Sequence, residues 1–96
     1  MKEVELLIHD KVKDRYGGIV EIKIWLVPKS TDKPYGYKYS LVYIKHGKRI
    51  LGYDNAEGKG DHRHYGNEET HYKFTNVKKL FDDFYRDLRE VKNYES

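Results

Sequence analysis

The chain of 96 residues has the length of one compact domain, and we expect a single domain that spans residues 1–96. No apolar run is long enough to cross a bilayer and cysteine is absent, which excludes a membrane-spanning helix, a disulfide framework and a thiolate nucleophile. The formal net charge of +3 lies entirely in residues 29–74, which carry nine Lys or Arg against six Asp or Glu, and four of the five histidines.

Two segments near the N-terminus alternate apolar and polar residues, and this period of two predicts strands. They run from Val4 to Ile8 and from Ile19 to Val27, and Tyr16-Gly17-Gly18 between them is a turn signal. We therefore expect an antiparallel hairpin. Residues 28–36 follow, and their proline, serine and glycine content predicts a loop.

A second hairpin is expected in the middle of the chain. Its strands cover Tyr37–Ile44 and Arg49–Asp54, and the tight turn between them has His46-Gly47 at its centre. This turn pairs Tyr43 with Ile50. Two apolar sets then lie on opposite faces of the sheet: Tyr39, Leu41 and Tyr43 on one, and Val42, Ile44, Leu51 and Tyr53 on the other. The pattern does not decide which face meets the core, and a one-residue bulge would exchange the faces.

The C-terminal part of the chain predicts one helix. Its apolar residues recur with helical spacing at Val77, Leu80, Phe81, Phe84, Leu88 and Val91, and Thr75 or Asn76 can cap the first turn. We expect the charged residues, Asp83 and Asp87 among them, to face water. Residues 55–72 are expected to form a loop. The fold class is therefore α+β: a four-stranded antiparallel sheet with one C-terminal helix packed on one face.

The segment from Gly52 to Tyr65 holds the densest group of reactive side chains. Gly58 and Gly60 flank Lys59, so backbone N–H groups can approach a ligand and the lysine can reach an anion, although a flexible turn has the same composition. The positive charge of this region favours an anionic partner such as RNA. An ordinary solvated surface explains the small charge imbalance equally well.

His62 and His64 are the strongest candidates for chemistry. In an extended segment they project to one side while Asp61, Arg63 and Tyr65 face the other way. Imidazole has a reference pKa of about 6.5, which suits a general base and a general acid near neutral pH. Such a pair can cleave RNA without a metal or cofactor. One histidine takes the 2′-OH proton, the other protonates the leaving 5′ oxygen, and cations hold the phosphate.

Two sets of site residues follow from this hypothesis. The catalytic set is His62 and His64 as base and acid in an order left open, Lys59 and Arg63 on the phosphate, and Asp61 or Asp54 orienting a histidine. The substrate-binding set is Tyr53, Asn55, Gly58 and Gly60.

Other interpretations of the same residues remain open. The two histidines with Asp54 and Asp61 could bind a divalent metal, but a third ligand at a familiar spacing is missing. Asp61 and His62 could make only structural hydrogen bonds. Tyrosines at 39, 43 and 53 could stack bases, although packing in the sheet is the commoner use. His9, His46 and His71 are expected to be surface residues. A non-catalytic module that binds nucleic acid or a protein is the main alternative function.

The chain resembles the TumE-type toxins of prokaryotic toxin–antitoxin pairs. The resemblance is carried by Tyr53-Asp54-Asn55, the run Gly58-Lys59-Gly60-Asp61-His62-Arg63-His64, Glu69, Tyr72-Lys73-Phe74, and the earlier Glu5-Leu6-Leu7-Ile8-His9 and Trp25-x-Val27-Pro28. It covers nearly the whole chain, with His71 where proline is more usual. The resemblance implies a toxin with a cognate antitoxin as partner, and it suggests ribonuclease action on RNA. The absence of a membrane-spanning run and of a signal-peptide segment leads us to expect a cytoplasmic protein with no membrane partner.

Overall fold

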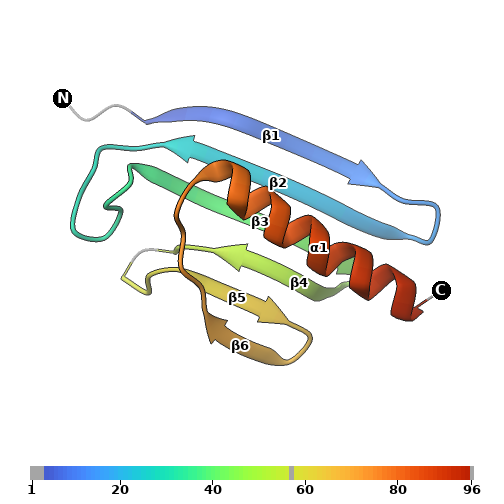
Figure 1. The fold of residues 1–96 in the computed structure, drawn as a ribbon. Coiled ribbons are helices and arrows are strands. Elements are labelled where there is room, and N and C mark those ends of the chain that lie inside the picture. Colours follow the sequence, from blue (N-terminus) through green and yellow to red (C-terminus); the bar gives the residue numbers. More distant parts are fainter. Residues whose placement is uncertain (1–3, 57, 96) are drawn as a thin grey trace.

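The computed structural model describes residues 4–56 and 58–95, which form an antiparallel sheet with one helix across one of its faces (Figure 1). The strands lie in the sheet in chain order: β1 (Glu5–Lys13), β2 (Gly18–Leu26), β3 (Tyr37–Lys45), β4 (Lys48–Asp54), β5 (His62–Tyr65) and β6 (Glu68–His71). The helix α1 (Val77–Glu95) follows. The expected α+β class with a C-terminal helix on an antiparallel sheet is confirmed.

The sheet has six strands, so the expected number of four is wrong. The two additional strands, β5 and β6, lie in the segment that was expected to be a loop. Each has only four residues, which is too short for a period of two to stand out in the sequence. The pairing of β5 with β4 and β6 supplies their backbone hydrogen bonds, and the turn between them is tied to β4 by Gly66 N–H donating to Ile50 O at 2.8 Å.

A β-bulge decides which face of β4 meets the core. Next to the His46-Gly47 turn the pairing follows the expected register, with Ile44 opposite Arg49. The register then shifts by one residue, so that Tyr43 lies opposite Leu51 and not Ile50. The shift brings Leu51 and Tyr53 of β4 to the face that carries Tyr39, Leu41 and Tyr43 of β3, while Val42 and Ile44 stay on the other face. The five residues that the shift brings together are at most 2% exposed.

The helix packs on this face through the predicted apolar stripe. Asn76 caps its first turn by accepting a hydrogen bond from Lys79 N at 2.8 Å on Oδ1. The stripe residues Leu80, Phe84, Leu88 and Val91 are buried in the core, and Val77 and Phe81 pack at its margin. The expectation that Asp83 and Asp87 face water is wrong, because both are buried. In the interface between sheet and helix, the carboxylates of Asp83 and Asp87 accept hydrogen bonds from side chains of both layers.

The opposite face of the sheet is not covered by the helix.

Within residues 4–56 and 58–95, no helix has both the length and the apolar character needed to cross a membrane.

Candidate active site on the uncovered sheet face

The two histidines of the reactive segment lie side by side on the uncovered face. Because β5 is extended, His62 and His64 project from one side of it, and Arg63 and Tyr65 project toward the helix. The centroids of the two imidazole rings are 6.5 Å apart.

Strand register places His62 in a row that crosses all six strands. Consecutive members of the row are opposite each other on neighbouring strands: His9, Lys23, Ser40, Asp54, His62 and His71. Their neighbours along the central strands, such as Ile22, Leu41 and Tyr53, are buried under the helix. The row therefore lies on the uncovered face, where polar side chains from distant parts of the chain come together.

Three charged residues surround His64. Its Nε2 lies 3.3 Å from Glu69 Oε2 and 3.5 Å from Asp54 Oδ2, and its Nδ1 lies 3.0 Å from Arg49 Nη2. A guanidinium can only donate, so Nδ1 is the acceptor and Nε2 carries the proton of the neutral ring. Of the two carboxylates expected to orient a histidine, Asp54 is the one that lies near His64, and its orienting role stays a prediction.

Arg49 was not identified from the sequence. It precedes the reactive segment, and only the strand register brings its guanidinium to His64. Gly52 makes room for it, because a Cβ there would lie 3.1 Å from Arg49 Cδ and 3.7 Å from His64 Cδ2. The absence of a side chain at Gly52 thus allows Arg49 to lie against His64.

His62 is held by the loop that precedes it. Its Nε2 lies 2.5 Å from Lys59 O, and a carbonyl can only accept, so Nε2 donates and Nδ1 is left unprotonated in the neutral ring. The ring of His71 stacks on that of His62, with centroids 5.7 Å apart. His71 is exposed, as expected. The sequence did not predict its contact with His62, because that contact depends on the pairing of β5 with β6.

The loop segment of residues 58–61 depends on its two glycines. Gly58 and Gly60 have φ values of 74° and 72°, in the left-handed region, and a Cβ on either would meet no atom within 4 Å. Backbone conformation, not lack of space, therefore favours glycine at both positions. Gly58 N donates to Asp32 Oδ1 at 3.1 Å, which anchors the loop to residues 28–36, and the side chain of Lys59 is exposed.

Asp61 and Asn55 point away from the histidines. Asp61 accepts hydrogen bonds from Tyr39 OH at 2.7 Å and from Phe74 N at 3.3 Å. Burial, reinforced by this bond to Asp61, raises the pKa of Tyr39 well above its usual range. The amide of Asn55 is buried, accepts from Tyr39 N at 2.9 Å and donates to Tyr37 O at 2.8 Å, so it continues the pairing of β3 beyond the end of β4.

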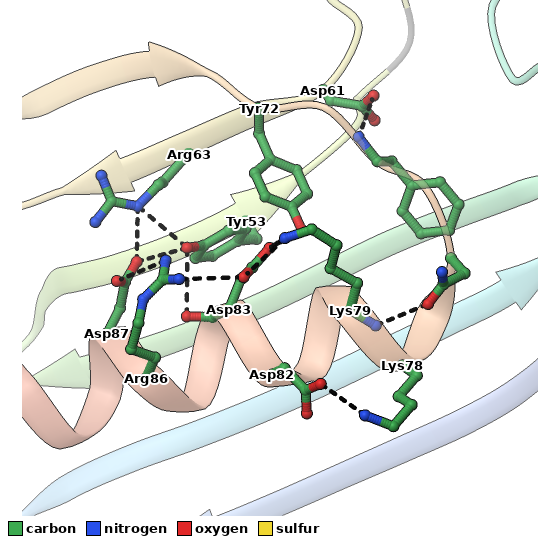
Figure 2. A network of polar contacts seen from close by, with 12 residues as sticks. Tyr53, Asp61, Arg63, Tyr72, Lys78, Lys79, Asp82, Asp83, Arg86 and Asp87 are labelled. Atoms are coloured by element: carbon green, nitrogen blue, oxygen red, sulfur yellow. Dashed lines mark hydrogen bonds and ion pairs between the residues drawn. The ribbon is translucent and has the colours of Figure 1, made fainter.

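Arg63 belongs to a polar network between the sheet and the helix (Figure 2). Its Nε donates to Asp87 Oδ2 at 2.7 Å and to Tyr53 OH at 3.1 Å. The bond to Asp87 raises the pKa of Arg63, while burial, together with the bond to Asp87, raises that of Tyr53. Tyr53 is fully buried, which leaves its side chain no surface to offer a substrate. Tyr39 and Tyr43 are buried too, so these tyrosines pack in the core.

Asp83 forms the second half of this network. Tyr72 OH donates to its Oδ2 at 2.5 Å, and Lys79 and Arg86 reach the same carboxylate at 3.0 Å and 3.3 Å (Figure 2). Burial raises the pKa of Asp83, but the hydrogen bonds from Tyr72 and Lys79 lower it by more, and the net pKa lies below the usual range. The buried carboxylates of Asp83 and Asp87, on the helix side of the sheet, thus both have hydrogen-bond donors.

Metal-ligating side chains do not gather into a site in the part of the chain that the structure describes. No group of three or more His, Asp or Glu residues there has a geometry that could hold a metal ion.

A comparison with protein families decides the kinship of the chain. The model of the family described as "Toxin TumE" matches residues 2–92. The chain belongs to the TumE toxin family. Membership in the TumE family implies a toxin with a cognate antitoxin as its partner. No curated protein and no solved structure was found to match this TumE chain.

Proposed function

We propose that this TumE toxin is a metal-independent endoribonuclease whose reacting groups are His62 and His64. The observation that supports this most is the position of the two imidazoles. They share the uncovered sheet face, 6.5 Å apart between centroids, with the guanidinium of Arg49 beside His64. A base and an acid that flank one phosphodiester, with a cation at hand, are what transfer of a phosphoryl group to a 2′-OH requires.

The tautomers favour one order of proton transfer. Nδ1 of His62 takes the proton of a ribose 2′-OH, and the 2′ oxygen attacks the adjacent phosphorus. The bond from phosphorus to the 5′ oxygen breaks as doubly protonated His64 gives that oxygen a proton. The products are a 2′,3′-cyclic phosphate and a 5′-hydroxyl, and no oxidant, metal or cofactor enters the balance.

Arg49 and Lys59 are the cations that hold the phosphate in this scheme. Arg49 moves its guanidinium from His64 Nδ1 to a phosphate oxygen when RNA binds, which also frees Nδ1 for the second proton of His64. Lys59 is exposed on the loop that Gly58 and Gly60 shape, so its ammonium can reach the same strand of RNA.

The remaining residues of the predicted site act as positioning residues. Asp54 and Glu69 orient the ring of His64. Arg63 fixes β5 to the helix through Asp87, on the side away from the histidines, and its role in the proposal is to position them. Asp61, Asn55 and Tyr53 hold the strands that meet at the site through the hydrogen bonds described above.

Cleavage of RNA by purified variants tests the proposal. His62→Ala and His64→Ala should each lower the cleavage rate by about 10²-fold or more, because each removes a proton-transfer group. His46→Asn is the matched control. His46 lies in the β3–β4 turn with φ of 53°, a conformation that asparagine tolerates, so its rate should equal that of the parent protein. The cyclic phosphate should appear at the new 3′ end.

Two outcomes would replace the proposal with an alternative. A parent protein that binds RNA without cleaving it would favour the non-catalytic module. Cleavage that is lost on dialysis against EDTA and restored by a divalent metal would favour a metal-dependent nuclease. Activity that survives EDTA, together with slow histidine variants, agrees with the metal-independent scheme.

The toxic action is tested separately in cells. Expression of the chain should arrest growth, and co-expression of a short open reading frame next to its gene should relieve the arrest if that frame encodes the antitoxin. An RNA target would place this action in the cytoplasm. His62→Ala and His64→Ala should both be tolerated by the host if cleavage causes the arrest.

A further inference from the structure

A hollow on the uncovered face adjoins the histidines. Its volume is about 320 Å³, at the lower end of the range of small-molecule sites. It is lined by residues from three neighbouring strands and the start of the following loop: Lys23, Trp25, Lys38, Tyr39, Ser40, Asp54 and Ala56. These strands are β2, β3 and β4, which lie in the middle of the sheet in Figure 1.

Asp54 connects the hollow with the candidate active site. It lines the hollow, lies opposite His62 in the strand pairing, and its Oδ2 is 3.5 Å from His64 Nε2. Lys23, Ser40 and Asp54 are consecutive members of the row that crosses the sheet. Neighbouring strands are about 4.8 Å apart, so the backbone at Ser40 lies roughly 10 Å from that at His62. A chain of nucleotides can span that distance without leaving the sheet.

The walls of the hollow combine an aromatic ring with positive charge. Trp25 offers the aromatic surface, and Lys38 Nζ lies 5.5 Å from the centroid of its ring. Lys23, on the same strand, adds a second cation with a side chain that is 37% exposed. Aromatic rings that stack bases, beside cations that follow the backbone, are the two elements by which proteins bind single-stranded nucleic acid. Ser40 and Asp54 can accept hydrogen bonds from the edge of a base.

From this combination we infer that the hollow is a nucleotide subsite. A base of single-stranded RNA stacks on Trp25, the adjoining phosphates lie against Lys23 and Lys38, and the next phosphodiester reaches His62 and His64. The inference rests on the proposed ribonuclease function for the identity of the ligand. It assigns a binding role to residues of β2 and β3, which lie outside the reactive segment.

Tryptophan fluorescence reports on this subsite directly, because Trp25 is the only tryptophan of the chain. The probe is a short 2′-O-methyl oligoribonucleotide, which lacks the attacking hydroxyl and cannot be cleaved by the proposed reaction. Its titration into the parent protein should quench Trp25 emission in a saturable way that weakens with added salt. Saturating probe that binds by an independent measure, such as calorimetry, but leaves the emission unchanged would overturn the inference.

The affinities of substituted proteins for the same probe show which side chains contribute to binding. Trp25→Ala should weaken binding at least about fivefold, as removal of one stacking partner does. Tyr85→Ala is the matched control, since Tyr85 is an exposed aromatic residue on the helix, on the other side of the sheet, and its loss should leave the affinity unchanged. Lys23→Gln should reduce the slope of log affinity against log salt by about 0.7, the loss of one phosphate contact on a single strand.

The subsite and the ribonuclease function fail in different ways. Trp25→Ala that is folded by circular dichroism and binds the probe as tightly as the parent overturns the subsite, whatever the histidine variants do to cleavage. A parent protein that quenches on binding the probe but never cleaves RNA keeps the subsite and overturns the function. Trp25→Ala should also raise KM for a cleavable RNA more than it lowers kcat, because it touches bound substrate away from the reacting atoms.

Discussion

The guanidinium of Arg63 is joined to the carboxylate of Asp87 by a hydrogen-bonded ion pair of 2.7 Å. Arg63 stands between His62 and His64 on β5, and Asp87 is buried on α1. The strand that carries both histidines has only four residues, with the short β6 beyond it. Its attachment to the helix through Arg63 therefore holds the histidines at a fixed position on the uncovered face.

Removal of Asp87 should destabilise the protein strongly. Asp87→Ala removes the nearer acceptor of the Tyr53 hydroxyl, which keeps Asp83 O at 3.5 Å, and leaves Arg63 without its counter-charge. Loss of one partner of a buried pair costs about 3–5 kcal/mol, and we expect the lower end, since Arg63 is 29% exposed. Urea denaturation measures the change. Asp82→Ala is the control, because Asp82 is exposed and forms an ion pair with exposed Lys78, and its substitution should cost at most about 0.5 kcal/mol. Equal losses in the two variants would contradict this account.

Replacement of Asn55 should affect stability and not the chemical step. Asn55→Ala leaves Tyr39 N and Tyr37 O without their side-chain partner, and an unsatisfied buried group costs about 1–3 kcal/mol. The free energy of unfolding should fall by that amount, while kcat for each folded molecule stays near that of the parent. A fall in kcat or affinity with no loss of stability would instead show that Asn55 contacts RNA directly.

A methyl group at Gly52 should disturb the active site more than the fold. In Gly52→Ala the new Cβ crowds Arg49 Cδ at 3.1 Å and contacts His64, and the flexible arginine side chain is the part that can give way. We expect slower RNA cleavage with a change in unfolding free energy below about 1 kcal/mol. The melting temperature and the cleavage rate of the same sample distinguish the two effects. Unchanged cleavage would argue against a role for Arg49 beside His64.

Acid should weaken the fold partly through Asp14. The backbone N–H of Gly18, with further bonds from Tyr43, Tyr16 and Lys92, lowers the pKa of Asp14 from 3.8 to about 2. A carboxyl group whose pKa is lower in the folded state contributes stability above its unfolded pKa and loses it as the pH falls through the folded pKa. This contribution should therefore be complete above pH 4 and fade between about pH 4 and pH 2. Urea midpoints across this range should fall less steeply for Asp14→Asn than for the parent, and parallel curves would refute the assignment.

Features with a local cause could be predicted from the sequence. The presence of four strands in two long hairpins, the His46-Gly47 turn, a cap at Thr75 or Asn76 and the apolar stripe of the helix each follow from local patterns in the chain, although β1 extends to Lys13, beyond the predicted Ile8. The same holds for the alternation along β5, which places both histidines opposite to Arg63 as soon as the backbone is extended.

Features that depend on strand pairing could not be predicted. The bulge between β3 and β4 exchanged the face of Leu51 and Tyr53, and the short strands β5 and β6 exist only because β4 offers an edge to pair with. Asp83 and Asp87 are charged, so the sequence places them on the surface. Their burial is possible because hydrogen-bond donors at the helix–sheet interface offset the cost of removing their carboxylates from water.

The sequence by itself determined the α+β class, the helix and its core-facing stripe, the kinship with TumE toxins and the side-by-side projection of two histidines. Periodicity and composition are enough for the class, the helix and the projection of the histidines, since each involves neighbours along the chain, and the kinship rests on the family's motif residues. The tertiary structure alone decided that Arg49, Glu69 and His71 surround those histidines and that Trp25 lies in a hollow next to them. Register across six strands sets these contacts, and register is a property of paired strands that no single segment contains.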